Sequence, residues 1–252
     1  MQRIHVVVAL VVALAFSGLP AFADVTVRMT LSTSGTPMAM EMTTVTYVKG
    51  QKLRTDAKGM NQDVSVLVDV PAGQQLMVNH ATRQVVSFDP NAAAASLPVS
   101  FGEITMSLEP SGETRDILGR KCTGYNLSVS MPMTMANETL TMKMWGPVWI
   151  AGDGPGVEDF TRFYKAALAA GRFVPSPLGQ GPQGKSMIEM QKAFAERGIP
   201  LEQEMQFGVE GGGQMAQAMG QMNMKMTMKA TAISTDPIAD EIFAVPAGYE
   251  KK

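Results

Sequence analysis

The stretch that decides the fold is Val25-Thr26-Val27-Arg28-Met29-Thr30-Leu31-Ser32, in which apolar and polar residues alternate strictly. Successive side chains of a β-strand point to opposite faces of a sheet, so this alternation predicts a strand with one buried face. The pattern recurs along the chain, with the apolar phases Val64/Val66/Val68/Val70, Ile104/Met106/Leu108, Tyr125/Leu127/Val129/Met131, Leu140/Met142/Met144 and Met222/Met224/Met226/Met228. Many short alternating segments predict a mainly β protein with an antiparallel sheet.

Turn-forming residues separate the predicted strands. They are Ser34–Pro37, Lys49-Gly50, Pro71–Gly73, Ser111-Gly112 and Leu118-Gly119. Glycine, proline and serine at these places favour tight connections between neighbouring strands. Because a polar phase accompanies the apolar phases, we expect one face of the sheet to meet water.

Helical spacing occurs late in the chain, over residues 157–170 and 186–197. Gly171 follows the first of these segments as an expected cap, and Pro200 prevents the second from continuing. Residues 214–221 are a candidate for a short third helix. Since the strand pattern resumes after these segments, we expect the helices to pack on the same sheet.

The first 23 residues have the pattern of a cleaved signal peptide. A short basic start at Met1–Arg3 precedes an apolar run over residues 4–16, and Ala21-Phe22-Ala23 fits a small-x-small cleavage site. The apolar run is too short for a transmembrane helix, and no cysteine follows the cleavage site for lipid attachment. We therefore expect a periplasmic or secreted protein without a stable membrane anchor, in which residues 24–252 form a single domain.

The composition excludes several classes of protein. The 252 residues carry a formal net charge of −2, and 45% of them are hydrophobic. The charge balance argues against a nucleic-acid binder, and the apolar fraction argues against general disorder. The single cysteine, Cys122, excludes a disulfide scaffold and a cysteine-based zinc cluster. The unusual feature is the methionine content, at 22 residues.

Several motifs taken together resemble the DUF4412 family of exported bacterial proteins, which is related to the LolA-like lipoprotein carriers. The resemblance rests on Lys52–Asp56, Glu113–Tyr125, Trp149, Gly198–Leu201 and Phe243–Tyr249, in that order. It implies a curved antiparallel half-barrel with two or three helices packed on or over its concave face. It also implies no catalytic residues, and by analogy of fold it suggests the handling of a hydrophobic ligand or a lipoprotein.

The methionines occur as lines of thioethers, because residues i and i+2 of a strand point the same way. A methionine-rich face is adaptable and suits a groove for varied apolar ligands. We therefore predict a ligand-binding hollow lined by Met131, Met133, Met142, Met144, Met222, Met224, Met226, Phe160 and Phe163. The same lines also allow plain core packing. A third reading is a Cu(I) site with two or three thioethers as ligands, for which Cys122 and His80 are the further candidate ligands.

The sequence thus predicts a non-enzymatic binding protein without a cofactor, whose partner is a lipid, an acyl chain or a lipoprotein. Movement of the helices, allowed by the Pro- and Gly-rich loop at 175–184, would release the ligand. The alternatives are a Cu(I)-binding protein and an envelope structural or stress protein with no small ligand. We expect Cys122 to be buried and inert, and His80 to be solvated in a turn between strands. The sequence leaves the ligand and the oligomeric state open.

Overall fold

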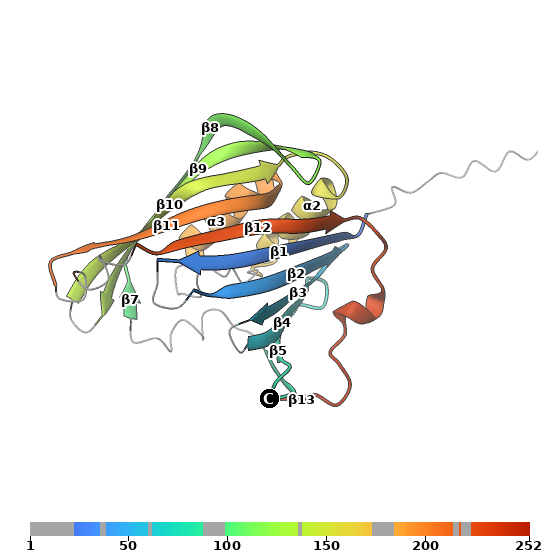
Figure 1. The fold of residues 1–252 in the computed structure, drawn as a ribbon. Helices are drawn as coiled ribbons and strands as arrows, with labels where there is room; N and C mark the ends of the chain where they lie inside the picture. Colours follow the sequence, from blue (N-terminus) through green and yellow to red (C-terminus); the bar gives the residue numbers. More distant parts are fainter. Residues whose placement is uncertain are drawn as a thin grey trace, which may run out of the picture.

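The fold is built from two runs of strands, separated in the chain and joined in one sheet (Figure 1). The computed structural model describes residues 23–35, 39–59, 62–87, 99–135, 138–172, 184–213, 217 and 223–252. The first run contains β1 (Val25–Ser34), β2 (Glu41–Lys49), β3 (Lys52–Gly59), β4 (Gln62–Asp69), β5 (Gln74–Asn79) and β6 (Gln84–Ser87). The second contains β7 (Val99–Phe101), β8 (Thr105–Ile117), β9 (Arg120–Met135), β10 (Glu138–Ala151), β11 (Ile199–Gly211) and β12 (Lys225–Ser234).

The two runs meet where β1 pairs with β12. Val27 lies opposite Ile233, and Leu31 lies opposite Met228. Within the described residues the sheet has thirteen strands in the order β13-β6-β5-β4-β3-β2-β1-β12-β11-β10-β9-β7, with β8 paired beside β9. The predicted mainly β, curved antiparallel sheet is therefore confirmed. The exception is β13 (Glu250–Lys251), which pairs parallel to β6.

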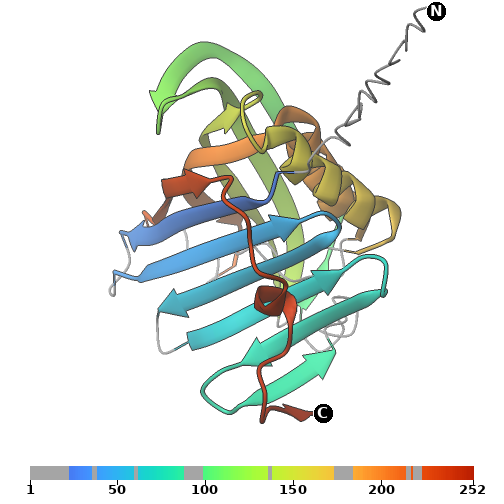
Figure 2. The same cartoon turned by 90° about the vertical axis from the view of Figure 1, so that its right-hand side faces the viewer.

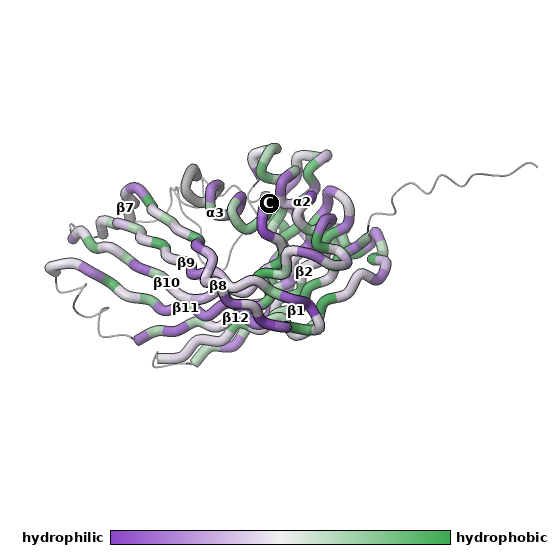
Figure 3. The backbone as a smooth tube through the Cα atoms, turned by 90° about the horizontal axis from the view of Figure 1, so that it is seen from above, coloured by the Kyte–Doolittle hydropathy of each residue, from purple (hydrophilic) through white to green (hydrophobic). Residues whose placement is uncertain are grey.

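Two helices lie on the concave side of this sheet, as predicted (Figure 3). They are α2 (Val157–Ala169) and α3 (Gly184–Arg197). Gly171 adopts a positive φ of 67°, and its N–H donates to the Leu168 carbonyl, which confirms the expected cap. The predicted helix at 214–221 lies outside the described residues except for residue 217. The predicted signal peptide lies outside them up to residue 22, and the predicted loop does so over 175–183.

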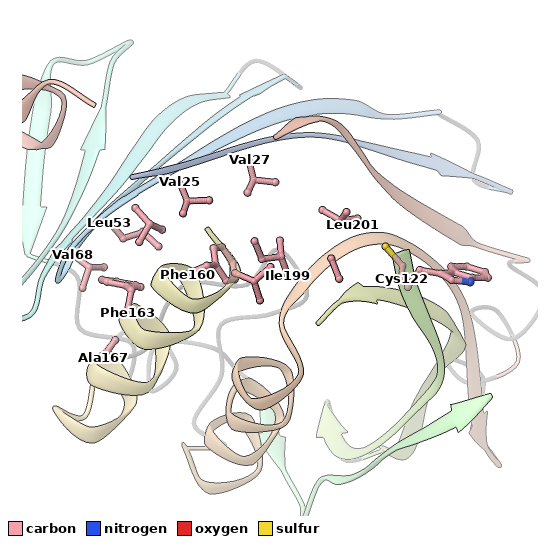
Figure 4. Close-up of a cluster of buried hydrophobic side chains, with 14 residues drawn as sticks. Val25, Val27, Leu53, Val68, Cys122, Phe160, Phe163, Ala167, Ile199 and Leu201 are labelled. Atoms are coloured by element: carbon pink, nitrogen blue, oxygen red, sulfur yellow. The ribbon is translucent and has the colours of Figure 1, made fainter. Parts of the chain in front are cut away.

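Helix α2 forms one half of the core by packing against β1–β4. Phe160, Phe163 and Ala167 recur at helical spacing and are buried. Figure 4 shows Phe163 pointing toward Leu53 and Val68 of the sheet. A fully buried phenylalanine contributes about 1.5–3 kcal/mol to stability, so this contact holds the helix to the strands.

Helix α3 forms the other half of the core with the second run of strands. Its buried Met190 belongs to an apolar cluster that includes Leu127, Met144, Met205 and Met226. Partly buried Ala193 and Phe194 extend the helix side of this cluster. The two helices therefore cover different parts of one concave face.

The expectation that the other face meets water is wrong for part of the sheet. A C-terminal strap, residues 235–252, runs across the outer face of the first strands (Figure 2). Val245 and Tyr249 pack there against Leu67, Val78 and Val85, and Ser65 is only 1% exposed. The polar phase of β4 therefore contributes to a second apolar layer. The alternating pattern of the strand itself does not reveal the covering segment.

Gly198 fixes the change of direction from α3 to β11. Its φ is +129°, and a Cβ built there would lie 2.0 Å from the carbonyl oxygen of Ala151. Backbone of this kind is accessible to glycine and strained for other residues. The close approach of Gly198 to β10 therefore fixes the place where α3 ends and β11 begins.

We expect Gly198→Ala to lower the free energy of unfolding by about 3 kcal/mol or more, because backbone strain and a steric clash with Ala151 act together. The matched control is Gly112→Ala. Gly112 also has a positive φ, +77°, but a Cβ there meets nothing within 4 Å. The control should lose only about 1–2 kcal/mol. Urea denaturation measures both values, and equal losses would contradict the role assigned to the clash.

Candidate functional site

The concave side of the sheet carries a continuous group of methionines, which we call the methionine face. Its members come from β2, β8, β9, β10, β11 and β12. They are Met42, Met106, Met131, Met133, Met142, Met144, Met205, Met226 and Met228. The strand register brings several of them together, since Met142 lies opposite Met131 and Met205 lies opposite Met226. Directly opposed side chains have Cβ atoms about 4.5–5.5 Å apart, so these thioethers pack against one another.

The methionine face divides into a buried part and an accessible part. The buried members are Met133, Met144, Met205 and Met226. The half-buried members are Met42, Met106, Met131, Met142 and Met228. Unbranched thioether side chains change rotamer easily, so the half-buried members are able to adjust to an apolar molecule laid on them.

The predicted ligand-binding residues are not equivalent in the structure. Met131 and Met142 are half-buried on the methionine face, and Met224 is half-buried just before β12. Three other predicted residues, Met133, Met144 and Met226, are buried in the same face. Met222 lies outside the described residues.

The two predicted aromatic residues lie elsewhere, in the core beneath α2. Phe160 and Phe163 are buried with Leu53 and Val68, and Phe163 has no exposed surface. A ligand would contact them only after α2 had left the sheet. Their packing role is therefore clear, and the accessible surface lies with the methionines.

The outer face carries a polar network that sequence reasoning missed. Ser65 Oγ donates to Asp56 Oδ1 at 2.5 Å and lies 2.6 Å from His80 Nε2. His80 Nδ1 lies 2.9 Å from the Tyr249 hydroxyl. Arg54 Nε donates to the same carboxylate oxygen at 2.6 Å. His80 lies in the turn after β5, as predicted, but it is half-buried with both ring nitrogens engaged and is less solvated than we expected.

The hydrogen-bond roles in this network follow from the proton count. The single proton of Ser65 goes to Asp56, so His80 Nε2 must donate to Ser65. In the neutral imidazole Nδ1 then accepts from the Tyr249 hydroxyl. Each proton points toward the Asp56 carboxylate, and Ser65 is too deeply buried to act as a nucleophile on a substrate. The network is best explained as a set of hydrogen bonds that holds the strap against the sheet.

Further contacts hold the strap to the sheet. Arg54 Nη1 donates to the Ile242 carbonyl at 2.9 Å, and Lys49 Nζ donates to the Ile238 carbonyl at 2.6 Å. Lys49 also pairs with Asp240 at 2.8 Å. The hydrogen bond from Lys49 holds the pKa of Asp240 below its usual value. No local motif joins these positions, because the strap and the strands it covers are far apart in sequence.

Two cavities border the strap and the outer face. One, of about 280 Å³, lies between the strap residues Phe243–Val245 and strands β3–β5. The other, of about 550 Å³, is open and is lined by Thr43, Val45, Arg54, Asp56, Lys58, Asp63 and His80. Charges of both signs line the open cavity, and Arg54 and Lys58 pair with Asp56 and Asp63 within it. The cavity therefore offers no unbalanced charge to a ligand.

Cys122 is buried, as predicted, and its Sγ donates to the Arg120 carbonyl at 3.5 Å. Burial raises the pKa of its thiol, which keeps it protonated at neutral pH. It belongs to the apolar cluster around Trp149, whereas His80 belongs to the outer polar network. The structure does not bring these two residues together as a nucleophile and base.

Two further features of the described residues bear on function. No group of three or more His, Cys, Asp or Glu side chains in the described segments is arranged to hold a metal ion. Helices long and apolar enough to cross a bilayer are also missing from the described part of the chain. The first finding does not concern thioether ligands, so it leaves the methionines as the residues to test for a soft metal.

Comparisons with known proteins give no family: no model of a protein family and no curated sequence matches the chain. Solved structures that resemble it include PNGF-II, with 13% identity and a TM-score of 0.37. That match covers 90% of this chain and 31% of PNGF-II, so the chain spans about a third of that protein. DUF4412 membership stays a prediction.

Two other similar structures match over most of both chains. One is a domain described as an outer membrane lipoprotein-sorting protein from Vibrio parahaemolyticus, with 6% identity and a TM-score of 0.35 over 88% of this chain and 90% of that one. The other is a DUF1329 family protein from Desulfovibrio piger, with 9% identity and a TM-score of 0.32 over 89% and 91%. At such TM-scores the function has to be argued from the residues of this chain.

We expect Tyr249→Phe to lower the free energy of unfolding by about 0.5–1.5 kcal/mol, because His80 Nδ1 loses its hydrogen-bond donor. Tyr47→Phe is the control, since the Tyr47 hydroxyl has no hydrogen-bond partner among the described residues. Chemical denaturation compares the two variants. A loss as large in the control would show that the hydrogen bond to His80 does not stabilise the strap.

We expect native Cys122 to react with iodoacetamide at pH 8 at least 100-fold more slowly than in 6 M guanidinium, because burial hides the thiol and raises its pKa. Mass spectrometry of timed aliquots measures the reaction. The denatured protein is its own control for reagent activity. Rapid native alkylation would contradict the buried and inert assignment.

Proposed function

We propose that this protein is an exported, periplasmic, non-enzymatic carrier of the LolA-like type and a member of DUF4412, and that it holds an acyl chain on its methionine face. The observation that carries the proposal is the accessible part of that face. Five half-buried methionines adjoin a buried apolar cluster on one concave surface. An apolar surface of this kind on a curved sheet is typical of a ligand-binding site.

The energetics favour a hydrocarbon occupant. Each methylene transferred from water to an apolar surface contributes about 0.8 kcal/mol, so a long acyl chain gains several kcal/mol in total. Binding of the acyl chain requires no preformed cavity, because the half-buried methionines can change rotamer and so shape an apolar surface around the chain. Met131 and Met142 face each other on adjacent strands and form the centre of the accessible part.

Helix α3 lies at the border of the proposed site. Phe194 and Met190 of the helix belong to the same apolar cluster as Met131 and Met228. An acyl chain lying along the methionines would therefore contact the helix as well as the sheet. We propose that displacement of α3 admits and releases the ligand.

Met142→Lys tests the proposal with the neutral apolar probe N-phenyl-1-naphthylamine, whose fluorescence rises on binding to an apolar surface. We expect its affinity to fall at least tenfold, because a charged group replaces a thioether where the probe lies. Met142→Leu should stay within about threefold of the original protein, since the volume and polarity are kept.

The matched control is Thr141→Lys, which introduces the same charge on the opposite face of the same strand. Its affinity for the probe should be unchanged. An equal loss in both lysine variants would contradict binding on the methionine face, and absence of probe binding by the original protein would contradict the carrier function itself.

A Cu(I) site is the second candidate, and the pairing of Met131 with Met142 favours it. Their thioethers lie opposite each other on neighbouring strands, and soft sulfur ligands suit Cu(I). Titration against a Cu(I) chelator separates the two functions. Stoichiometric binding that is lost in the double variant Met131→Leu/Met142→Leu supports copper, whereas probe binding kept in that variant supports the acyl carrier.

A further inference from the structure

One polar side chain lies among the apolar residues of the concave face. Gln203 of β11 is only 6% exposed, and its Nε2 is buried with no hydrogen-bond acceptor among the described residues. It lies opposite Val148 on one neighbouring strand and opposite Met228 on the other. Directly opposed residues point to the same face of a sheet, and Val148 and Met228 belong to the cluster beneath α3.

A buried amide N–H without an acceptor is unfavourable. Leaving such a donor unpaired costs the protein about as much as losing a hydrogen bond, and native proteins rarely keep one without a purpose. A leucine or methionine at this position of β11 would pack against Val148 and Met228 without that penalty. Retaining an amide here therefore points to an acceptor that arrives with a ligand.

The surroundings of Gln203 allow such an acceptor to reach it. Met228 is half-buried, and it is the residue directly opposite Gln203. We expect a rotamer change of that thioether, together with the proposed displacement of α3, to open a path from the methionine face to the amide. The acceptor would then approach between apolar side chains, where a hydrogen bond is stronger than in water.

We propose that Gln203 Nε2 donates a hydrogen bond to the carbonyl oxygen of an acyl ester or acyl amide. The ligand class is then an acylated molecule, such as a glyceride or an acylated protein terminus. A plain hydrocarbon or an alkyl ether lacks the carbonyl group. The inference rests on the proposed carrier function, since it names the group of the ligand that the methionine face receives.

The test compares two lipids that differ at one carbonyl group, 1-palmitoylglycerol and 1-O-hexadecylglycerol. Each displaces N-phenyl-1-naphthylamine from the original protein and from Gln203→Met, an apolar variant of similar volume. We expect the original protein to prefer the ester by roughly 3- to 10-fold, the ratio that one hydrogen bond supplies. Gln203→Met should bind both lipids equally and keep its affinity for the naphthylamine probe.

The unliganded variant provides a second measurement. Because the substitution removes an unpaired donor, the denaturation midpoint of Gln203→Met should equal or exceed that of the original protein. If the Gln203 amide had only a structural role, Gln203→Met would have a lower denaturation midpoint than the original protein. It would also keep the original protein's ratio of ester affinity to ether affinity, and this result would overturn the inference.

The remaining outcomes separate this inference from the proposed function. Probe binding without ester preference in the original protein, or a preference that persists in Gln203→Met, overturns the role of Gln203 and leaves the carrier function standing. Failure of the original protein to bind the probe and both lipids overturns the carrier function and, with it, the ester site.

Discussion

The pairing of β1 with β12 is the contact on which the rest of the structure depends. It joins the two runs of strands into one sheet, and the residues it pairs are far apart in the sequence. Closing so long a segment of chain has an entropic cost, which the burial of Val25, Val27 and Leu31 offsets. Without this pairing, α2 and α3 would have no common concave face to cover.

The concave face combines two kinds of packing. Beneath α2, aromatic and branched side chains such as Phe163, Leu53 and Val68 form a rigid core. Beneath and beyond α3, methionines replace them, and several stay partly exposed. Rigid packing holds the sheet in shape, whereas flexible thioethers let an adjoining surface adapt to an occupant. This division separates the part that stabilises the fold from the part proposed to bind a ligand.

The outer face has a different role. The C-terminal strap fills the apolar area over β4–β6 with Val245 and Tyr249, and the polar network ending at Asp56 fastens it. Because each proton of that network has an acceptor, buried Ser65 and half-buried His80 are stabilised by their hydrogen bonds. The strap thus covers the apolar part of the outer face over β4–β6, whereas the methionines of the concave face stay partly exposed.

The sequence by itself determined β1, β4, β8, β9, β10 and β12, the two helices, and the side of these strands that carries methionine. Alternation has a period of two and helices a period of 3.6, so local spacing is enough to assign these elements. It also predicted that Cys122 is buried. Only the tertiary structure decided that β1 adjoins β12 and that Tyr249 contacts His80. It alone separated accessible Met131 from buried Phe163, because burial depends on which distant segments cover a residue, and no local pattern records that.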